Sequence, residues 1–412
     1  MRQRTCAIQH HLLDIPPLLR RFSSSLSLWP QRRRLCDRGG ISCPDDVSVV
    51  DRLYDGLTQG CRAALAESIT LVESTHPRKR EQADSLLSRL SKRAQAVFEN
   101  RGEAALSFRI GFSGAPGAGK SSFIEAFGTF LLNHSQEQRA SSSDCAASSS
   151  SSHLASSRRL AVLTVDPSSP RSGGSLLGDL TRMPRLACHP SAFVRPSPNH
   201  GRLGGVARGT QEAVALCEAA GYQTIFVETV GVGQSELAVR DMVDVFCLLV
   251  APGGGDELQG LKRGLVEAVD VVLVTKADGS LLPAARAAQA EYTSALKFLR
   301  ARSVNWRPPV LAVSAHEGKG MQEVWEAMSK FRRLSLSSGE FLAERRRQLT
   351  SSFWRYVEME LLERVHSGER RPLAARLESD VASARLTPGA AADQLLRAFF
   401  AEERTKRSPS SC

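Results

Sequence analysis

The stretch FRIGFSGAPGAGKSS, residues 108–122, decides the fold of this chain. Its first residues, 108–112, form an apolar run that predicts a buried strand. The helical spacing of Ile124, Phe127 and Leu131 predicts an amphipathic helix just after it. Between the two, GAPGAGKSS fits the phosphate-loop pattern G-x-x-x-x-G-K-[ST] in the strand–loop–helix context that the motif requires. The sequence therefore predicts an α/β domain that binds a nucleotide after its first strand.

Each part of this loop has a physical role in holding phosphate. Glycines let several backbone N–H groups turn towards one anion, and the new helix directs its positive end at the same point. We expect Lys120 to add a mobile charge to the β- and γ-phosphates, and the Ser121 hydroxyl to take one Mg²⁺ position. The nucleotide contacts predicted in the loop are Gly114, Ala115, Pro116, Gly117, Ala118, Gly119, Lys120, Ser121 and Ser122.

The segment TKAD, residues 275–278, indicates which base is bound. A carboxylate at Asp278 can accept the N1–H and 2-amino hydrogens of guanine, which adenine does not offer. Lys276 can lie over the plane of the base. Thr275 stands where GTPases usually have Asn, and we expect its hydroxyl not to copy the contacts of the amide. Backbone N–H groups facing the guanine oxygen are predicted at Ser314, Ala315 and His316.

The string ETVGVGQSE, residues 228–236, predicts the metal and γ-phosphate side of the site. Glu228 and Gly231 give E-x-x-G where most GTPases have D-x-x-G, so the acid can reach Mg²⁺ directly or through water and the glycine N–H can sense the γ-phosphate. Gln234 is a candidate for positioning the attacking water, although it could equally be a hinge. The predicted magnesium ligands are Ser121, Asp166, Asp179 and Glu228, and the predicted catalytic residues are Lys120, Glu228 and Gln234.

The rest of the chain predicts a mostly parallel P-loop sheet flanked by helices, because short apolar runs alternate with helical stretches. The predicted strands are 108–112, 160–165, 224–227, 243–250, 269–275 and 310–313. The predicted divisions are a leader at 1–48, a helical preface at 49–104, a GTPase domain at 105–334 with a disordered serine-rich insert at 134–158, and a C-terminal helical region at 335–412. An apolar stripe in that last region packs either on the chain's own sheet or on a second copy, and periodicity leaves both open.

Composition separates the leader from the body of the protein. The chain has 412 residues and a net charge of +11, but residues 1–40 hold eight arginines and two acids, which is typical of a mitochondrial transit peptide. The body is then only slightly basic, so we expect no nucleic-acid partner. No run of 18 apolar residues predicts a membrane span, and nine scattered cysteines without CxxC or zinc spacing predict reduced thiols.

Four long strings resemble the metallochaperone-related GTPases that serve adenosylcobalamin-dependent methylmalonyl-CoA mutase, the methylmalonic aciduria type A protein family. They are VDPSSPRSGGSLLGDLTRM at 165–183, HGRLGGVARGTQEAVALCEAAGYQTIFVETVGVGQSE at 200–236, APGGGDELQGLKRG at 251–264 and TKADG at 275–279. The resemblance covers about residues 49–400 apart from the serine-rich insert.

The resemblance implies a Mg²⁺-dependent GTPase that binds GTP and GDP, turns over slowly and forms a homodimer through its C-terminal helices. The arginine-rich leader predicts that the protein works in the mitochondrial matrix. Its nucleotide-sensing segments would be 166–179, 228–236 and 253–263. The implied function is gated loading of adenosylcobalamin into methylmalonyl-CoA mutase, or a related cobalamin-dependent acyl-CoA mutase, and rescue of inactivated enzyme. We expect no cobalamin bound directly, since the D-x-H-x-x-G pattern is absent from the sequence.

Three other functions remain to be weighed against this one. A nickel or cobalt metallochaperone needs a His-rich tract or a Cys/His pair near the phosphate loop, and the nine histidines are dispersed. An ATP-dependent kinase is disfavoured by Asp278. A GTP-binding scaffold without turnover is separated from a GTPase by measuring hydrolysis.

Overall fold

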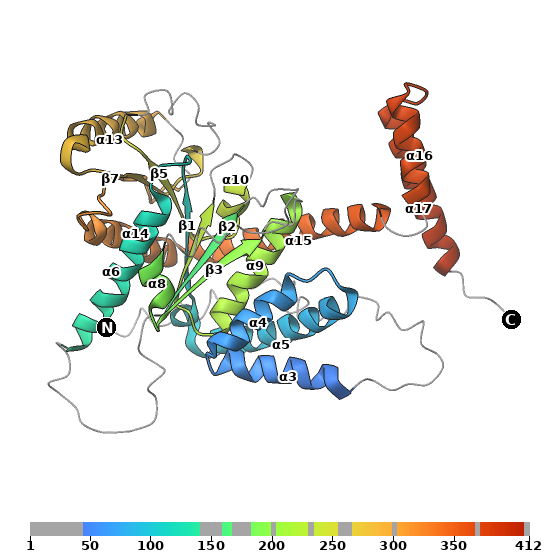
Figure 1. Ribbon diagram of the computed structural model, residues 1–412, viewed down its shortest axis with the longest axis horizontal. Coiled ribbons are helices and arrows are strands. Elements are labelled where there is room, and N and C mark those ends of the chain that lie inside the picture. The colour runs from blue at the N-terminus through green and yellow to red at the C-terminus, as the bar shows by residue number, and fades with distance from the viewer. Residues whose placement is uncertain are drawn as a thin grey trace, which may run out of the picture.

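The computed structural model describes residues 44–140, 159–166, 183–198, 203–229, 235–253, 266–298, 303–366 and 371–407 (Figure 1). In this part of the chain a sheet of seven strands has the order β3-β2-β4-β1-β5-β6-β7, and all neighbours run parallel. The strands are β1 Phe108–Ser113, β2 Leu160–Asp166, β3 Ala192–Pro198, β4 Thr224–Thr229, β5 Val245–Val250, β6 Val271–Val274 and β7 Val310–Ala312. The predicted parallel α/β sheet is confirmed.

Helices cover both faces of the sheet (Figure 1). One face carries α3 Pro44–Thr58, α4 Arg62–Val72, α5 Pro77–Arg101, α9 Leu203–Ala219, α10 Ser235–Arg240 and α13 Leu282–Lys297. The other carries α6 Lys120–Ala140, α8 Pro184–Cys188 and α14 Met321–Ser337. Alternate residues of a strand enter opposite layers: Phe226 packs with the α6 side and Val227 with the α9 side. Strands buried on both faces explain the continuous apolar runs in the sequence.

Strand β3 was missing from the sequence prediction. It lies at the edge of the sheet and pairs with β2 from Ala192 to Pro198. Its sequence AFVRPSP contains two prolines, which weaken any strand prediction but are tolerated on an edge where one row of N–H groups has no neighbouring strand. Arg195 also faces outward to the helical preface, where it bonds Glu73 of the α4 C-terminus at 2.8 Å.

Some predicted boundaries fall inside helices. α3 begins at Pro44, within the predicted leader, and α6 continues to Ala140, past residue 134 where we placed the start of the insert. Its last residues, SQEQRA, include good helix formers, which explains the extension. Residues 1–43 and 141–158 lie outside the described residues. The division at 334/335 stays a prediction, and that position lies within α14.

The C-terminal region is helical, as expected. α15 Glu340–His366 is followed by α16 Arg371–Ala382 and α17 Pro388–Arg407, which stand away from the sheet at the far end of α15 (Figure 1). The first half of α15 is fixed to the body: Arg345 donates to both carboxylate oxygens of Asp244, each at 2.8 Å. Among the described helices, none is both long and apolar enough to cross a membrane.

Candidate nucleotide-binding site

The phosphate loop lies between β1 and α6, at the carboxyl edge of the sheet. Its first glycine cannot be replaced without a collision, because a Cβ added at Gly114 would lie 2.2 Å from the Leu249 carbonyl oxygen of β5. Gly114 has φ 153° and Gly119 has φ 82°, conformations that side chains rarely adopt. The loop thus requires glycine for the reason that the motif predicts, and the helix α6 begins directly after it at Lys120.

Lys120 lies folded over the loop. Its Nζ donates to the carbonyl oxygens of Gly114 at 2.7 Å and Ala115 at 3.0 Å, and the residue is 8% exposed. Pro116 and Gly117 form the exposed tip of the loop, and Ser122 is an exposed residue of the first turn of α6. The ammonium group is therefore held where an arriving phosphate would meet it.

Ser121 and Glu228 meet between the first turn of α6 and the end of β4. The Ser121 hydroxyl donates to Glu228 Oε1 at 2.9 Å, and Glu228 is 7% exposed. A hydroxyl and a carboxylate oxygen are the hard ligands that Mg²⁺ prefers. These two residues therefore fit the predicted metal position, and the pairing also keeps the carboxylate buried with a donor.

The segment predicted to contact the base, residues 275–278, is hydrogen-bonded to the residues that follow β7. Ser314 Oγ donates to the Asp278 carboxylate and accepts a hydrogen bond from the Glu317 N–H at 3.0 Å. The Ala277 N–H donates to the Val313 carbonyl at 3.0 Å. The segment at Asp278 is therefore bound to the segment at Ser314 by side chain and backbone alike, which orients the carboxylate.

Three further residues predicted to contact the base lie next to the hydrogen bond between Ser314 and Asp278. Lys276 is exposed and has φ 53°, a left-handed conformation that is uncommon outside glycine. Ala315 and His316 lie in a turn closed by a bridge between Ser314 and Lys319, and His316 is exposed. The predicted set Lys276, Asp278, Ser314, Ala315 and His316 is thus gathered by the ends of β6 and β7.

Thr275 has a contact that the sequence reasoning missed. Its hydroxyl lies 2.7 Å from the Ala118 carbonyl oxygen of the phosphate loop and 3.1 Å from that of Val250, and its backbone N–H already donates to Val250. We assign the hydroxyl hydrogen to the shorter contact. The Thr275 hydroxyl therefore joins the TKAD segment to the phosphate loop, whereas the expectation that it does not copy the contacts of an asparagine amide stays a prediction. No local pattern signals a bond between residues so far apart in the chain.

Other predicted residues are only partly placed. Asp166 is the last residue of β2, in register with Pro198 of β3. Asp179 and Gln234 lie outside the described residues, as do most of the predicted nucleotide-sensing segments. In the part of the chain that the structure describes, no three His, Cys, Asp or Glu side chains gather as a metal cluster.

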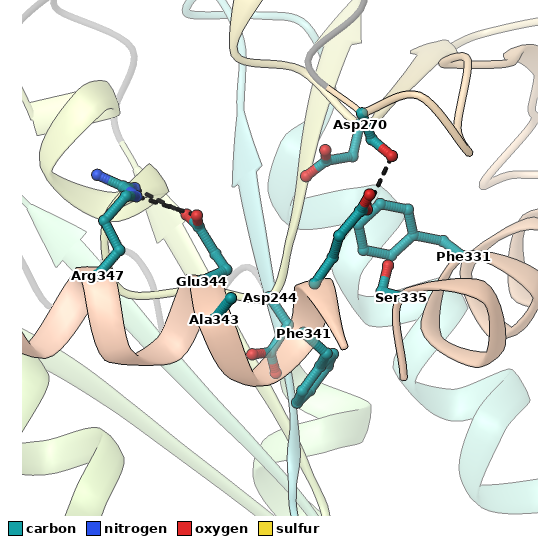
Figure 2. Close-up of a pocket in the computed structure, with 10 residues that line it drawn as sticks. Asp244, Asp270, Phe331, Ser335, Phe341, Ala343, Glu344 and Arg347 are labelled. Carbon is teal, nitrogen blue, oxygen red and sulfur yellow. Dashed lines mark hydrogen bonds and ion pairs between the residues drawn. The ribbon is translucent and has the colours of Figure 1, made fainter. Parts of the chain in front are cut away.

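A separate cavity of about 270 Å³ lies at the other end of the strands from the phosphate loop, where β5 and β6 begin (Figure 2). Asp244 and Asp270 line it from the strands, and Phe341, Glu344 and Arg347 from α15. Burial raises the pKa of Asp270 to about 6, although Arg240 opposes the shift. The cavity is thus an acidic junction between the sheet and α15, away from the phosphate loop.

Comparisons with known proteins find relatives over most of the chain. A family model described as methylmalonyl Co-A mutase-associated GTPase MeaB matches residues 65–370. The mouse methylmalonic aciduria type A homolog, mitochondrial, is 51% identical over 85% of this chain and 79% of its own length. A probable GTPase of Mycobacterium bovis is 46% identical over 86% of this chain and 97% of its own. The crystal structure of a LAO/AO transport system kinase is 32% identical, with a TM-score of 0.61 over 85% of this chain and 98% of that one.

Proposed function

Since this chain belongs to the family of methylmalonyl-CoA mutase-associated GTPases, we propose that it is a Mg²⁺-dependent GTPase that gates the cofactor supply of an adenosylcobalamin-dependent acyl-CoA mutase. GTP hydrolysis is the activity of the family, and probable GTPases are among its bacterial relatives. The observation that carries the proposal is the meeting of Ser121 with Glu228 beside an intact phosphate loop, because it supplies metal ligands and phosphate donors at one place.

The phosphate end of the site would act mainly by positioning charge. On nucleotide binding, Lys120 exchanges the carbonyl oxygens of Gly114 and Ala115 for phosphate oxygens, so its charge moves to where negative charge develops in the transition state. Ser121 and Glu228 would hold Mg²⁺, together with Asp166 and Asp179; when bound, this ion neutralises the phosphates. Gln234 remains the candidate for positioning the attacking water.

The base end would select guanine. Asp278 accepts two hydrogens from the guanine edge, and Ser314 holds that carboxylate in place beforehand. Lys276 covers the base, and the turn with Ala315 and His316 supplies N–H groups for the guanine oxygen. Adenine offers no hydrogens at these positions to the half-buried Asp278 carboxylate, which is why we propose GTP and GDP as ligands rather than ATP.

The proposed partner is methylmalonyl-CoA mutase or a related cobalamin-dependent enzyme. The family description names association with that mutase, and the mouse relative is named for methylmalonic aciduria. We propose that the nucleotide state of this protein gates the loading of intact adenosylcobalamin and the rescue of inactivated mutase. The cobalamin would then be held by the partner.

We also propose a homodimer formed through the C-terminal helices. α15 exposes large apolar side chains from Leu349 onward, and α17 exposes two more. They are Leu349, Phe353, Trp354, Leu361, Leu362, Leu396 and Phe400. A row of exposed aromatic and leucine side chains on a projecting helix is typical of a protein interface. We therefore favour packing of this stripe on a second copy, one of the two alternatives that the sequence left open.

The proposed location is the mitochondrial matrix. The arginine-rich leader at 1–48 supports it, and relatives from mouse and nematode carry the word mitochondrial in their names. Import of a fusion to residues 1–48 into isolated mitochondria would test the leader separately from the GTPase.

The nucleotide site is tested by Lys120→Ala with Lys92→Ala as the control. Lys92 is an exposed lysine of α5, so its loss matches the charge change at a distance from the loop. We expect Lys120→Ala to weaken GTP binding about tenfold to a hundredfold, the range for losing hydrogen bonds to a charged group. Calorimetric titration with GTP and Mg²⁺ measures it. Equal affinities for the two variants would refute the assignment of the loop.

A further inference from the structure

Helix α10 follows the strand that carries Glu228 and packs between the sheet and α15; residues 230–234, which join the two, lie outside the described residues. β4 ends at Thr229, next to the Ser121 contact, and α10 runs from Ser235 to Arg240. Val239 of α10 is 1% exposed and packs against β1 at Gly111, where a Cβ would meet it at 3.2 Å. The missing side chain of Gly111 thus allows α10 to lie close on the strand that feeds the phosphate loop.

The last residue of α10 is buried between the sheet and α15. Arg240 is 4% exposed; its Nε donates to the Ala268 carbonyl at 3.1 Å and its Nη1 to that of Val243 at 3.2 Å. Its Nη2 lies 3.7 Å from both Asp270 and Glu344. One guanidinium group therefore contacts the start of β6 and α15 at once.

The next residue, Asp241, binds α15 directly. Its two carboxylate oxygens accept hydrogen bonds from Arg347 at 2.9 Å and Arg355 at 3.4 Å. Arg347 is held for this contact by Glu344, which it bonds at 2.7 and 3.0 Å (Figure 2). Two arginines two turns apart on α15 thus converge on the residue that follows α10.

These contacts are distinct from the anchor of α15. Arg345 binds Asp244 and the Ser107 carbonyl, at the beginnings of β5 and β1, and Gln348 donates to the Val243 carbonyl at 2.7 Å. Because this anchor is independent of Asp241, α15 can stay docked on the sheet when the Asp241 contacts are removed. The two sets of contacts can therefore be separated by substitution.

We propose that Arg240 and Asp241 couple the nucleotide site to α15, so that the seating of α15 on α10 sets the relative affinity of the site for GTP and GDP. At the end of β4, Glu228 accepts a hydrogen bond from the Ser121 hydroxyl, which would coordinate the metal of a bound triphosphate instead. Just past the end of α10, Asp241 is held by Arg347 and Arg355 of α15. Because α10 packs on β4 and β1, we expect a rearrangement at Glu228 to change the position of α10, and with it the distance from Asp241 to α15.

The coupling rests on the proposed GTPase function, and it is reciprocal. If GTP and GDP differ in how they change the seating of α15, then seating changes the ratio of the two affinities by the same factor, and a substitution that alters the seating shifts that ratio. α15 also carries the exposed apolar residues of the proposed dimer interface. The coupling would give a second copy, or any protein bound on that helix, a route to the nucleotide.

The test uses Asp241→Asn in the full chain, with Glu363→Gln as the matched control. Glu363 also forms an ion pair from α15, but with Arg80 of α5 at 3.0 Å. Dissociation constants for GDP and for a non-hydrolysable GTP analogue are measured with Mg²⁺ for both variants and the wild type. We expect Asp241→Asn to change the ratio of the two constants about fivefold, within the usual range of coupling energies, and Glu363→Gln to leave it unchanged.

Arg347→Gln provides a second variant that leaves the Asp241 side intact, and we expect the ratio to shift in the same direction. Hydrogen exchange of residues 340–355 supplies an independent measurement: it should differ between the GDP and GTP-analogue complexes of the wild type, and this difference should shrink in Asp241→Asn. An unchanged ratio in both variants, with normal nucleotide binding, would overturn the coupling and leave the GTPase proposal standing. A wild-type protein that binds no guanine nucleotide would overturn both.

Discussion

Ser121 of the phosphate helix donates its hydroxyl hydrogen to Glu228 at the end of β4, across 2.9 Å. The contact joins the residue that ends the phosphate-loop motif to the acid of the E-x-x-G string. Most GTPases have aspartate at that position, and the additional methylene of glutamate extends the reach of the carboxylate from β4. The pair therefore holds two metal-binding oxygens together on neighbouring elements.

Glu228→Gln should weaken the Mg²⁺ dependence of nucleotide binding. The amide can still accept the Ser121 hydrogen bond, but it lacks the charge that attracts the cation. We expect GTP affinity at saturating Mg²⁺ to fall about tenfold, the value for one lost charge-assisted contact, and GTP affinity in EDTA to change little. Titrations with and without the metal measure the difference, and a variant with wild-type Mg²⁺ dependence would remove Glu228 from the metal site.

Asp278→Asn should change the base preference. The asparagine amide donates where the carboxylate accepted, so it matches the 2-oxo group of xanthine rather than the amino group of guanine. We expect GTP affinity to fall at least about a hundredfold and xanthosine triphosphate to bind better than GTP. Competition between the two nucleotides measures the preference. Retention of the GTP preference would show that Asp278 does not contact the base.

Thr275→Val should loosen the phosphate loop, whereas Thr275→Ser should not. Valine has nearly the shape of threonine but no hydroxyl, so the buried Ala118 carbonyl loses the donor at 2.7 Å. The expected loss in the free energy of unfolding is about 1–3 kcal/mol, together with weaker GDP binding. Urea unfolding without nucleotide and titration with GDP measure the two effects. If serine and valine variants behave alike, the hydroxyl contributes nothing.

Asp270→Asn should change how stability depends on pH. Burial raises the pKa of this carboxyl from 3.8 to about 6, so the folded state holds its proton more tightly than the unfolded state. The resulting stabilisation is complete below pH 3.8 and is lost as the pH rises to 6. Asparagine has no such loss, and relative to wild type it should gain about 2 kcal/mol between pH 4 and pH 7. Urea unfolding at both pH values tests this; a constant difference would contradict it.

Much of the fold and of the site could be predicted because motifs mark the strand ends. The loop after β1, the acid at the end of β4 and the TKAD string after β6 each follow an apolar run, and parallel strands bring their carboxyl ends together at one end of the sheet. Strand β3 could not be predicted in this way, because its two prolines and Arg195 are typical of a loop. Only its pairing with β2 shows that it is a strand.

The contacts between the motifs could not be predicted from the sequence. Thr275 and Ala118 are joined only once the sheet places β6 near the loop, and Ser314 reaches Asp278 through its side chain rather than its backbone. The link from Asp241 to Arg347 likewise depends on where α15 crosses the base of the sheet. Such long-range hydrogen bonds leave no periodicity or spacing by which one chain could reveal them.

The most direct test of the central claim is steady-state GTP hydrolysis with and without methylmalonyl-CoA mutase, with ATP as the parallel substrate and Lys120→Ala as the inactive control. The proposed function predicts slow, Mg²⁺-dependent turnover of GTP that the mutase accelerates, little turnover of ATP, and neither basal nor stimulated activity in Lys120→Ala. Preferential turnover of ATP, or a GTPase rate that no cobalamin-dependent acyl-CoA mutase changes, would contradict the account.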